Sequence, residues 1–249
     1  MSPAEVVARL RAAGCVFAEE EATLLAGDGR DLDALVARRV AGEPLEQVLG
    51  WVAFCGLRVL LEPGVFVPRQ RTALLVEEAV ALGGRVVVDL CCGSGAVGLA
   101  VAAALRDAEL VGADVDPAAV ACARRNGVDA RAGDLFDALP EHLGGRVDLL
   151  CVNAPYVPTD AIADMPPEAR DHEPATALDG GADGLDLHRR VAAGARGWLA
   201  PGGSLLLETS RGQAPGTLAA VTAGGLAARL VTDDDRGAAV VVGTRVRGS

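Results

Sequence analysis

The sequence is poor in aromatic residues and in positive charge. Aromatic side chains make up 3% of the 249 residues, so the core must be packed with aliphatic side chains. The formal net charge of -11 argues against a protein whose main task is to grip nucleic acid, because that affinity comes from lysine and arginine. We interpret the acidity as favouring solubility, and we expect no direct contact with nucleic acid.

Membrane-spanning and secretory signals are also missing. No apolar run is long enough to cross a bilayer, and the first residues lack the basic segment and apolar core of a signal peptide. The six cysteines form no C-x-x-C pair, which disfavours a zinc site and a disulfide framework. We therefore expect a soluble cytoplasmic protein with reduced thiols, no bound metal and no membrane contact. The sequence does not indicate an oligomeric state.

Apolar residues make up 51% of the chain, and their spacing divides it into three parts. Residues 1–50 predict a small helical segment that begins with a Ser-Pro pair, a common helix start. Residues 51–68 predict a β-hairpin linker around Gly56. Residues 69–249 are long enough for one large α/β domain.

Strand and helix patterns alternate from residue 85 onward. We predict strands at residues 86–90, 110–114, 128–131, 147–153, 203–208, 227–232 and 238–246. This alternation predicts a doubly wound, seven-stranded, mostly parallel sheet, closed by an antiparallel end. Residues 159–184 show no regular pattern, and a structureless loop of that length suggests a functional role.

The stretch 147–158 is the most informative in the chain. It begins as an apolar run typical of a strand buried on both faces and ends at Asn153, where prolines stop the ladder. The next residues are Ala154, Pro155 and Tyr156, the only tyrosine. Because α/β sheets bind ligands at the carboxyl ends of parallel strands, we expect this stiff turn to hold a flat polar group.

Three further motifs follow predicted strands and describe a pocket for a nucleoside with a charged tail. The first is a glycine-rich turn that lets a ligand approach the backbone, with Asp89 able to accept from an ammonium or hydroxyl group. The second is Asp114, which can accept two hydrogen bonds from a ribose diol, whereas Asp116 is better placed to cap the next helix. The third is Asp134, which can accept from an adenine amine beside the backbone N–H of Leu135.

Together these residues resemble class I S-adenosylmethionine-dependent methyltransferases, and more narrowly the HemK/PrmC family of release factor glutamine methyltransferases. That family ends its fourth strand in Asn-Pro-Pro-Tyr, where this chain has Asn153, Ala154, Pro155 and Tyr156. The resemblance covers about residues 40–249. It includes residues 42–50, 67–69, 173–185, 206–208 and 212–213.

The resemblance implies a Rossmann-like fold and methyl transfer from S-adenosylmethionine to the side-chain amide of a glutamine in a peptide chain release factor. The Asn153 side-chain oxygen and the Ala154 carbonyl would accept the two N–H bonds of the target amide, and Tyr156 would stack on it. It assigns catalysis to Asn153, Ala154, Pro155 and Tyr156. It assigns cofactor contacts to Asp89, Cys91, Gly93, Gly95, Asp114, Val115, Asp134, Leu135, Asn153 and Arg69.

Three departures from the family pattern leave other functions open. Ala154 replaces a proline, residues 70–73 differ from the usual turn, and the N-terminal segment is shorter than the family's docking bundle. Any planar amino group fits the same clamp, so the alternatives are N-methylation of nucleic acid or a small molecule, or a non-catalytic cofactor-binding protein. Arg69 either orders the pocket, holds the substrate or lies exposed. We expect a structural role for Glu208.

His172 and His188 are expected at the surface rather than as catalytic bases. The chemistry implied by the resemblance does not require a base, because an amide nitrogen is made reactive by positioning rather than by deprotonation.

Restoring the family's proline tests the role of the missing ring. Ala154 keeps the carbonyl acceptor but lacks a ring that stiffens the turn. We therefore expect the native protein to be active and the Ala154→Pro variant to show a higher kcat, measured in steady-state methyl-transfer assays. An unchanged turnover would show that the ring is irrelevant.

Overall fold

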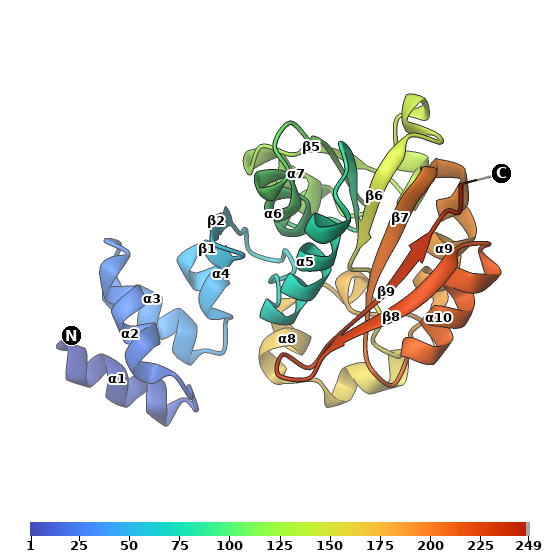
Figure 1. Cartoon of the computed structure of the whole chain (residues 1–249). Coiled ribbons are helices and arrows are strands. Elements are labelled where there is room, and N and C mark those ends of the chain that lie inside the picture. The colour runs from blue at the N-terminus through green and yellow to red at the C-terminus, as the bar shows by residue number, and fades with distance from the viewer. Residues whose placement is uncertain (248–249) are drawn as a thin grey trace.

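The computed structural model describes residues 1–247, with a group of N-terminal helices to one side of a seven-stranded sheet (Figure 1). The N-terminal helices are α1 (Pro3–Ala12), α2 (Ala18–Gly27), α3 (Leu32–Val40) and α4 (Leu45–Leu49). Ser2 caps α1: its hydroxyl accepts from the Glu5 N–H, and the Glu5 carboxylate accepts from the Ser2 N–H. The helical segment predicted for residues 1–50 therefore consists of four helices.

The N-terminal helices bury a small core of their own. It consists of Val6, Leu10, Ala18, Ala22, Leu25, Leu35, Val36, Val48 and Leu49. A core of this size contributes little stability by itself, so the helices depend on contacts with the rest of the chain. We propose that residues 1–50 act as one structural unit.

The predicted β-hairpin follows these helices. Strand β1 (Trp51–Phe54) pairs antiparallel with β2 (Leu57–Leu60). The two turn residues, Cys55 and Gly56, both have positive φ (47° and 79°), as a two-residue type I′ turn requires. Asn126 ties the hairpin to the larger domain, because its side chain bonds both backbone groups of Leu60 (2.8 and 2.9 Å) and the Ser94 carbonyl (3.0 Å).

The central sheet has seven strands in the order β5-β4-β3-β6-β7-β9-β8. They are β3 (Val86–Leu90), β4 (Glu109–Asp114), β5 (Asp129–Ala132), β6 (Val147–Val152), β7 (Leu199–Thr209), β8 (Ala227–Asp233) and β9 (Ala238–Thr244). The first five strands in this order are parallel, and β9 runs antiparallel to both β7 and β8. The predicted doubly wound sheet with an antiparallel end is confirmed.

Helices cover both faces of this sheet. The remaining α-helices are α5 (Ala73–Leu82), α6 (Ala96–Ala104), α7 (Pro117–Arg125), α8 (Pro167–His172), α9 (Asp186–Trp198) and α10 (Ala214–Ala223). The short 3-10 helices are η1 (Gln70–Thr72), η2 (Leu135–Ala138), η3 (Glu141–Leu143), η4 (Thr159–Asp164) and η5 (Ala175–Ala177). Within residues 1–247, every helix is too short or too polar to cross a bilayer.

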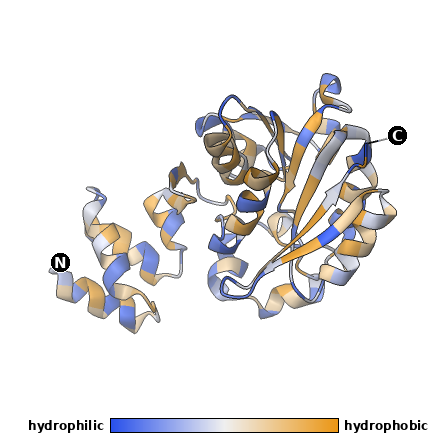
Figure 2. Cartoon of the chain, viewed as in Figure 1, coloured by the Kyte–Doolittle hydropathy of each residue, from blue (hydrophilic) through white to orange (hydrophobic). Residues whose placement is uncertain are grey.

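Alternate residues of the central strands point to opposite faces of the sheet. Leu150 and Leu207 pack on the face covered by α9 and α10, whereas Leu149 and Leu206 pack on the face covered by α5 and α6. Because both faces are buried, these strands are continuous apolar runs, and the hydrophobic colouring of the central strands in Figure 2 shows the result. This continuity is why β6 and β7 are recognisable from the sequence.

The segment between β6 and α9 is not structureless, contrary to the sequence prediction. It contains η4, α8 and η5, each preceded by a proline: Pro158, Pro166 and Pro174. These elements are three to six residues long, which is too short for an apolar period to appear in the sequence.

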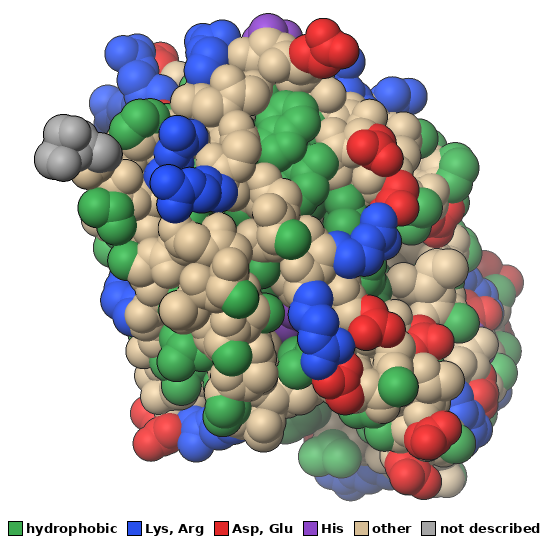
Figure 3. All heavy atoms as spheres, turned by 90° about the vertical axis from the view of Figure 1, so that its right-hand side faces the viewer, with side chains coloured by type: hydrophobic (Ala, Val, Ile, Leu, Met, Phe, Trp, Pro, Cys, Tyr) green, Lys and Arg blue, Asp and Glu red, His purple; other side chains and the backbone are tan. Residues whose placement is uncertain are grey.

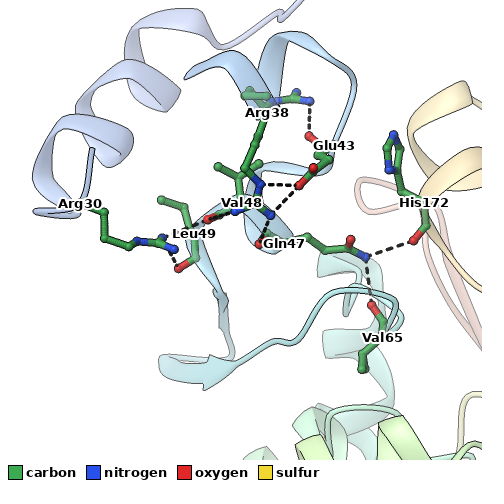
Figure 4. A network of polar contacts seen from close by, with 9 residues as sticks. Arg30, Arg38, Glu43, Gln47, Val48, Leu49, Val65 and His172 are labelled. Atoms are coloured by element: carbon green, nitrogen blue, oxygen red, sulfur yellow. Dashed lines mark hydrogen bonds and ion pairs between the residues drawn. The ribbon is translucent and has the colours of Figure 1, made fainter. Parts of the chain in front are cut away.

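Polar contacts join the N-terminal helices to this segment. Gln47 on α4 donates through Nε2 to the carbonyl oxygens of Val65 (3.3 Å) and His172 (3.4 Å) (Figure 4). Arg39 on α3 is paired with Glu168 on α8 (2.6 Å) and also with an acidic residue of α2. The N-terminal unit is therefore fixed against α8.

His188 on α9 is buried, contrary to the expected surface position. Its exposed fraction is 0%, its Nδ1 lies 3.0 Å from the Thr217 hydroxyl, and its Nε2 has no hydrogen-bond partner within residues 1–247. It shares the buried face of α9 with Val191 and Ala195. Burial, with a smaller contribution from Arg189, lowers the pKa of His188 from 6.5 to about 4.

Burial of neutral His188 predicts a loss of stability in acid. Between pH 6.5 and about 4 the unfolded chain binds a proton at this residue that the native protein does not, so the free energy of unfolding falls as the pH decreases. The difference between the two pKa values corresponds to at most about 3 kcal/mol. His188→Gln should flatten this part of the pH dependence in denaturant unfolding. The same substitution at exposed His142 is the control, and equal slopes in all three proteins would contradict the assignment.

Candidate functional site

A cavity of about 640 Å³ lies at the carboxyl ends of β3, β4 and β6, where parallel sheets place ligands. The turns after β3, β4 and β5 form one part of its wall, and the residues after β6 form another. The predicted site residues that line it are Arg69, Cys91, Gly93, Asp114, Val115, Asp134, Leu135, Asn153, Ala154, Pro155 and Tyr156. The structure therefore brings together most of the residues named from the sequence.

Asp89 and Gly95 do not line this cavity. The buried Asp89 carboxylate accepts a hydrogen bond from the Gly98 N–H (2.8 Å) and so holds the first turns of α6 against β3. Burial raises the pKa of Asp89 to about 7. Gly95 has a φ of 80°, and a Cβ there would lie 2.7 Å from the Val128 side chain. Both residues therefore support the glycine-rich turn without lining the cavity.

Asp114, the last residue of β4, faces the cavity with both carboxylate oxygens partly engaged. Its Oδ2 accepts from the Gly93 N–H and its Oδ1 from the Asp116 N–H, each at 2.9 Å. Each oxygen can accept a further bond, so the carboxylate is held in place and remains available to a ligand. Burial raises the pKa of Asp114 above its usual value. As predicted, Asp116 caps α7, accepting from the Ala118 N–H.

The turn after β5 presents Asp134 and Leu135. Leu135 has a φ of 51°, a conformation uncommon for a residue with a branched side chain. The Asp134 Oδ2 is paired with Arg190 of α9 at 2.7 Å, and both side chains are about half exposed. Arg190 lines the cavity as well, and the sequence did not single it out.

Asn153 and Ala154 present two hydrogen-bond acceptors after β6. The Asn153 Nδ2 lies 3.5 Å from the Thr72 hydroxyl oxygen. Within residues 1–247 no donor bonds the Asn153 Oδ1 or the Ala154 carbonyl oxygen. Both residues line the cavity, so these two acceptors without a protein donor belong to its wall.

The backbone of Tyr156 is fixed by residues distant in sequence. Its carbonyl oxygen accepts from the Gln213 Nε2 (2.8 Å), which also donates to the Asp183 carbonyl (2.9 Å). Gly184, with a φ of 74°, approaches so closely that a Cβ there would lie 2.3 Å from the Tyr156 oxygen. These contacts stiffen the turn in which Ala154 occupies the position of the family's proline.

The Tyr156 hydroxyl lies between two charged side chains. It donates to the Glu208 Oε1 (3.3 Å) and accepts from the Arg71 Nη2 (2.9 Å). Burial raises the pKa of Tyr156 to about 12, with the Glu208 charge adding to the effect, so the phenol keeps its proton. Arg71 lines the cavity, whereas Glu208 lies behind it.

Arg69 is paired rather than exposed. Its Nη2 lies 2.7 Å from each carboxylate oxygen of Glu173, and Glu173 Oε1 also accepts from the Val67 N–H (3.2 Å). Burial raises the pKa of Glu173, and the Arg69 charge opposes that rise. Of the roles considered from the sequence, ordering the pocket wall is the one that this geometry supports.

The sequence did not indicate the contacts of Arg71, Thr72 and Glu208 at the site. Glu208 follows the apolar run of β7, and a carboxylate after an apolar strand is the signal that pointed to Asp89 and Asp114. Arg71 and Thr72 lie on η1, whose three residues carry no such signal.

The site combines two kinds of group. One end of the cavity offers carboxylates, Asp114 and Asp134, to a nucleoside, and the other offers two neutral acceptors beside an aromatic ring. Within residues 1–247 no group of three or more His, Cys, Asp or Glu side chains is placed to bind a metal ion. The arrangement suits group transfer between a nucleoside and a planar N–H group.

Comparisons with known proteins find methyltransferases, which agrees with a site arranged for group transfer. The family model for the Methyltransferase small domain matches residues 56–165, from the hairpin turn to η4. A release factor glutamine methyltransferase of Geobacter sulfurreducens is 40% identical over 220 residues, which cover 85% of this chain and 76% of the relative. A 4-amino-L-phenylalanine/4-methylamino-L-phenylalanine methyltransferase of Streptomyces pristinaespiralis is 40% identical over 186 residues, which cover 70% of this chain and 63% of that protein.

The fold comparison confirms the predicted fold class. The crystal structure of a methyltransferase from Pyrococcus furiosus matches 84% of this chain and 97% of its own with a TM-score of 0.58, at 16% sequence identity. That likeness concerns the fold, and the sequence identity to the G. sulfurreducens protein over most of both chains shows the family. This chain belongs to the release factor glutamine methyltransferase family.

Proposed function

We propose that this protein transfers a methyl group from S-adenosylmethionine to the side-chain amide nitrogen of a glutamine in a peptide chain release factor. One observation carries the proposal: the Asn153 Oδ1 and the Ala154 carbonyl stand at the cavity with no donor from residues 1–247 bound to either. A primary amide has two N–H bonds to give to such a pair. The name of the G. sulfurreducens relative supports a release factor as the acceptor.

The residues that would hold S-adenosylmethionine fit its parts. The Asp114 carboxylate, held by Gly93 and Asp116, would accept from the ribose diol. Asp134 and the backbone of Leu135 would contact the adenine edge, and the turn at Gly93 would admit the methionine portion close to the backbone. When bound, this cofactor supplies an electrophilic methyl group on a sulfonium.

The side chains after β6 would act on the acceptor amide by position rather than by deprotonation. An amide nitrogen is a weak nucleophile because its lone pair is delocalised into the carbonyl. Acceptors at Asn153 Oδ1 and Ala154 O would hold both N–H bonds and favour the partly positive nitrogen that develops during transfer. The Tyr156 ring would restrict the plane of the amide, so that one face of the nitrogen points at the methyl group.

A small-molecule amine is the second candidate acceptor. The S. pristinaespiralis relative is named for a free amino acid with an aromatic amino group, which is also planar and carries two N–H bonds. The clamp of Asn153 and Ala154 does not by itself distinguish the two acceptors.

The surface charge supports a protein or small-molecule acceptor over nucleic acid. On the face covered by α9 and α10, Figure 3 shows positive side chains scattered among acidic and uncharged ones rather than merged into one basic surface. The formal net charge of -11 also disfavours a nucleic-acid acceptor.

Removing the Asn153 amide should abolish transfer while sparing cofactor binding. We expect Asn153→Ala to lower kcat by about 100-fold or more, because one of two acceptors for the developing charge is lost. The Kd for S-adenosylhomocysteine, measured by calorimetry, should stay within about two-fold. Asn126→Ala is the matched control, because Asn126 is the only other asparagine of the chain and does not line the cavity. Normal transfer by Asn153→Ala would show that the clamp is wrong.

A methyl-transfer assay with parallel acceptors tests the proposed substrate. Labelled S-adenosylmethionine is offered with a release factor, with 4-amino-L-phenylalanine and with an oligonucleotide. We expect label in the release factor, at a glutamine located by mass spectrometry. Label only in the amino acid would establish the second candidate acceptor. Label only in the oligonucleotide would contradict both candidate acceptors. Cofactor binding without any transfer would point to a sensor.

A pair of Asp→Asn variants tests the nucleoside end of the cavity. Asp114→Asn keeps the shape of the side chain but replaces one acceptor oxygen by an NH₂ group, so we expect affinity for S-adenosylhomocysteine to fall about 10-fold or more. Asp116→Asn serves as the control, since asparagine caps a helix as well as aspartate does. Equal affinities of the two variants in calorimetry would rule out Asp114 as the ribose contact.

A further inference from the structure

Gln213 connects the acceptor clamp, formed by Asn153 and Ala154, to two other parts of the chain. It precedes α10, in the turn that follows β7. Its Nε2 donates to the main-chain carbonyl oxygens of Tyr156 (2.8 Å) and Asp183 (2.9 Å). An amide NH₂ group has two protons, so both of them are used. Gln213 therefore joins the turn that carries the clamp to the loop before α9.

Ser210 determines which end of the Gln213 amide faces these carbonyls. The Ser210 hydroxyl accepts from the Gln213 backbone N–H (3.2 Å) and donates to the Gln213 Oε1 (2.6 Å). A carbonyl oxygen can only accept, so this contact fixes Oε1 on the side of Ser210 and leaves Nε2 to face Tyr156 and Asp183. The reverse orientation would place the amide oxygen against two carbonyl oxygens.

The clamp lies between two points that are held from β7. Before the clamp, Val152 at the end of β6 pairs with Leu207 of β7. After the clamp, the Tyr156 carbonyl is bound by Gln213 in the turn that follows β7. Only residues 153–155 lie between these two points, and the last of them is a proline, whose φ is fixed by its ring. A segment this short has little freedom to move while both of its ends are held.

Glycines let the loop before α9 close on this contact. A Cβ at Gly184 would lie 2.2 Å from the Gln213 Nε2, and a Cβ at Gly180 would lie 2.7 Å from the Tyr156 Cα. A side chain at either position would displace Gln213 or the Tyr156 backbone. Three segments of the chain are thus packed around one peptide group, which leaves the Tyr156 backbone a single position.

We propose that Gln213 and Ser210 are positioning residues for methyl transfer. By fixing the Tyr156 carbonyl, they hold the Tyr156 ring and the clamp acceptors at the angle from which the substrate nitrogen meets the methyl group. The inference rests on the proposed function, since it identifies what keeps the clamp in the geometry which that function requires. Neither residue lines the cavity, so both act through the Tyr156 backbone. A displacement of the turn by about 1 Å would cost on the order of 100-fold in rate.

A substitution at Gln213 tests this role in methyl-transfer kinetics. Gln213→Leu keeps much of the side-chain length but removes both donors. We expect it to lower kcat about 10-fold or more toward the acceptor that the parallel assay identifies, because the clamp loses its alignment. The Kd for S-adenosylhomocysteine should remain that of the native protein, which also shows that the variant folds.

Asn126→Ala is the matched control for this substitution. The Asn126 Nδ2 also donates to two main-chain carbonyl oxygens, those of Leu60 (2.9 Å) and Ser94 (3.0 Å), and Asn126 does not line the cavity. Both variants should lose stability in denaturant unfolding, whereas only Gln213→Leu should lose turnover. Equal kcat values in the two variants would overturn the inference, because Gln213 would then contribute to stability alone.

Ser210 provides a second test that leaves Gln213 in place. Ser210→Ala removes the donor to the Gln213 Oε1, so the amide can turn and release the Tyr156 carbonyl. We expect kcat to fall about three-fold or more, as the loss of one hydrogen bond implies. Ser210→Thr keeps the hydroxyl and should restore the native kcat. A Ser210→Thr variant as slow as Ser210→Ala would contradict the role of the hydroxyl.

The only tyrosine of the chain gives a readout that does not depend on catalysis. Tyrosine labelled with carbon-13 at its carbonyl introduces a single label, at the oxygen-bearing carbon that Gln213 contacts in Tyr156. Carbonyl carbon-13 signals move upfield when a hydrogen bond is lost. We therefore expect an upfield shift in the NMR spectrum of Gln213→Leu, a smaller one in Ser210→Ala, and the native position in Asn126→Ala.

These outcomes separate the inference from the proposed function. A native kcat in Gln213→Leu, or an unmoved Tyr156 carbonyl signal, overturns the inference and leaves the proposed function standing. If the native protein methylates no release factor, the proposed function fails. The carbonyl signal, together with kcat toward any acceptor that takes the label, then still decides whether Gln213 holds the Tyr156 turn.

Discussion

The parallel pairing of β6 with β7 is the constraint on which the site depends. Both strands are buried on both faces, so their register is selected by which side chains fit the two close-packed cores. The register that packing selects sets Val152 beside Leu207, and the polar residues that follow are thereby brought together. The same burial that stabilises the sheet thus decides which side chains meet at its carboxyl edge.

Buried carboxylates then shape the ends of the strands. Asp89, Glu173 and Glu208 are all nearly inaccessible to solvent, and burial raises the pKa of each. Each compensates its lost hydration with hydrogen bonds: Asp89 to the first turns of α6, Glu173 to the Val67 N–H and Arg69, and Glu208 to the Tyr156 hydroxyl. The cost of leaving such groups without partners holds the turns around the cavity in one conformation.

One part of the cavity wall is built by contacts between distant parts of the chain. Gln47 and Arg39 attach the N-terminal helices to α8, and Glu173 directly after α8 attaches the same segment to Arg69. Residues 174–181 continue from there along the cavity. The chain has no lysine, so its 23 lysine-or-arginine positions are all arginines, whose several donors let Arg39 and Arg69 each engage more than one acceptor atom.

The sequence by itself determined the strands, their alternation with helices and the polar residues at their ends, because burial on two faces leaves long apolar runs and a ligand site interrupts them with Asp114, Asp134 or Asn153. It also predicted the residue types of the clamp. Tertiary structure decided the helices between residues 159 and 184, because elements this short show no apolar period in the sequence. It also decided the burial of His188 and the structural contacts of Asp89, because burial depends on which other elements pack against a residue. The pairing of Tyr156 with Arg71 and Glu208 joins residues 85 and 52 positions apart. No local pattern encodes such contacts, because only the folded sheet brings their strands and turns to the same edge.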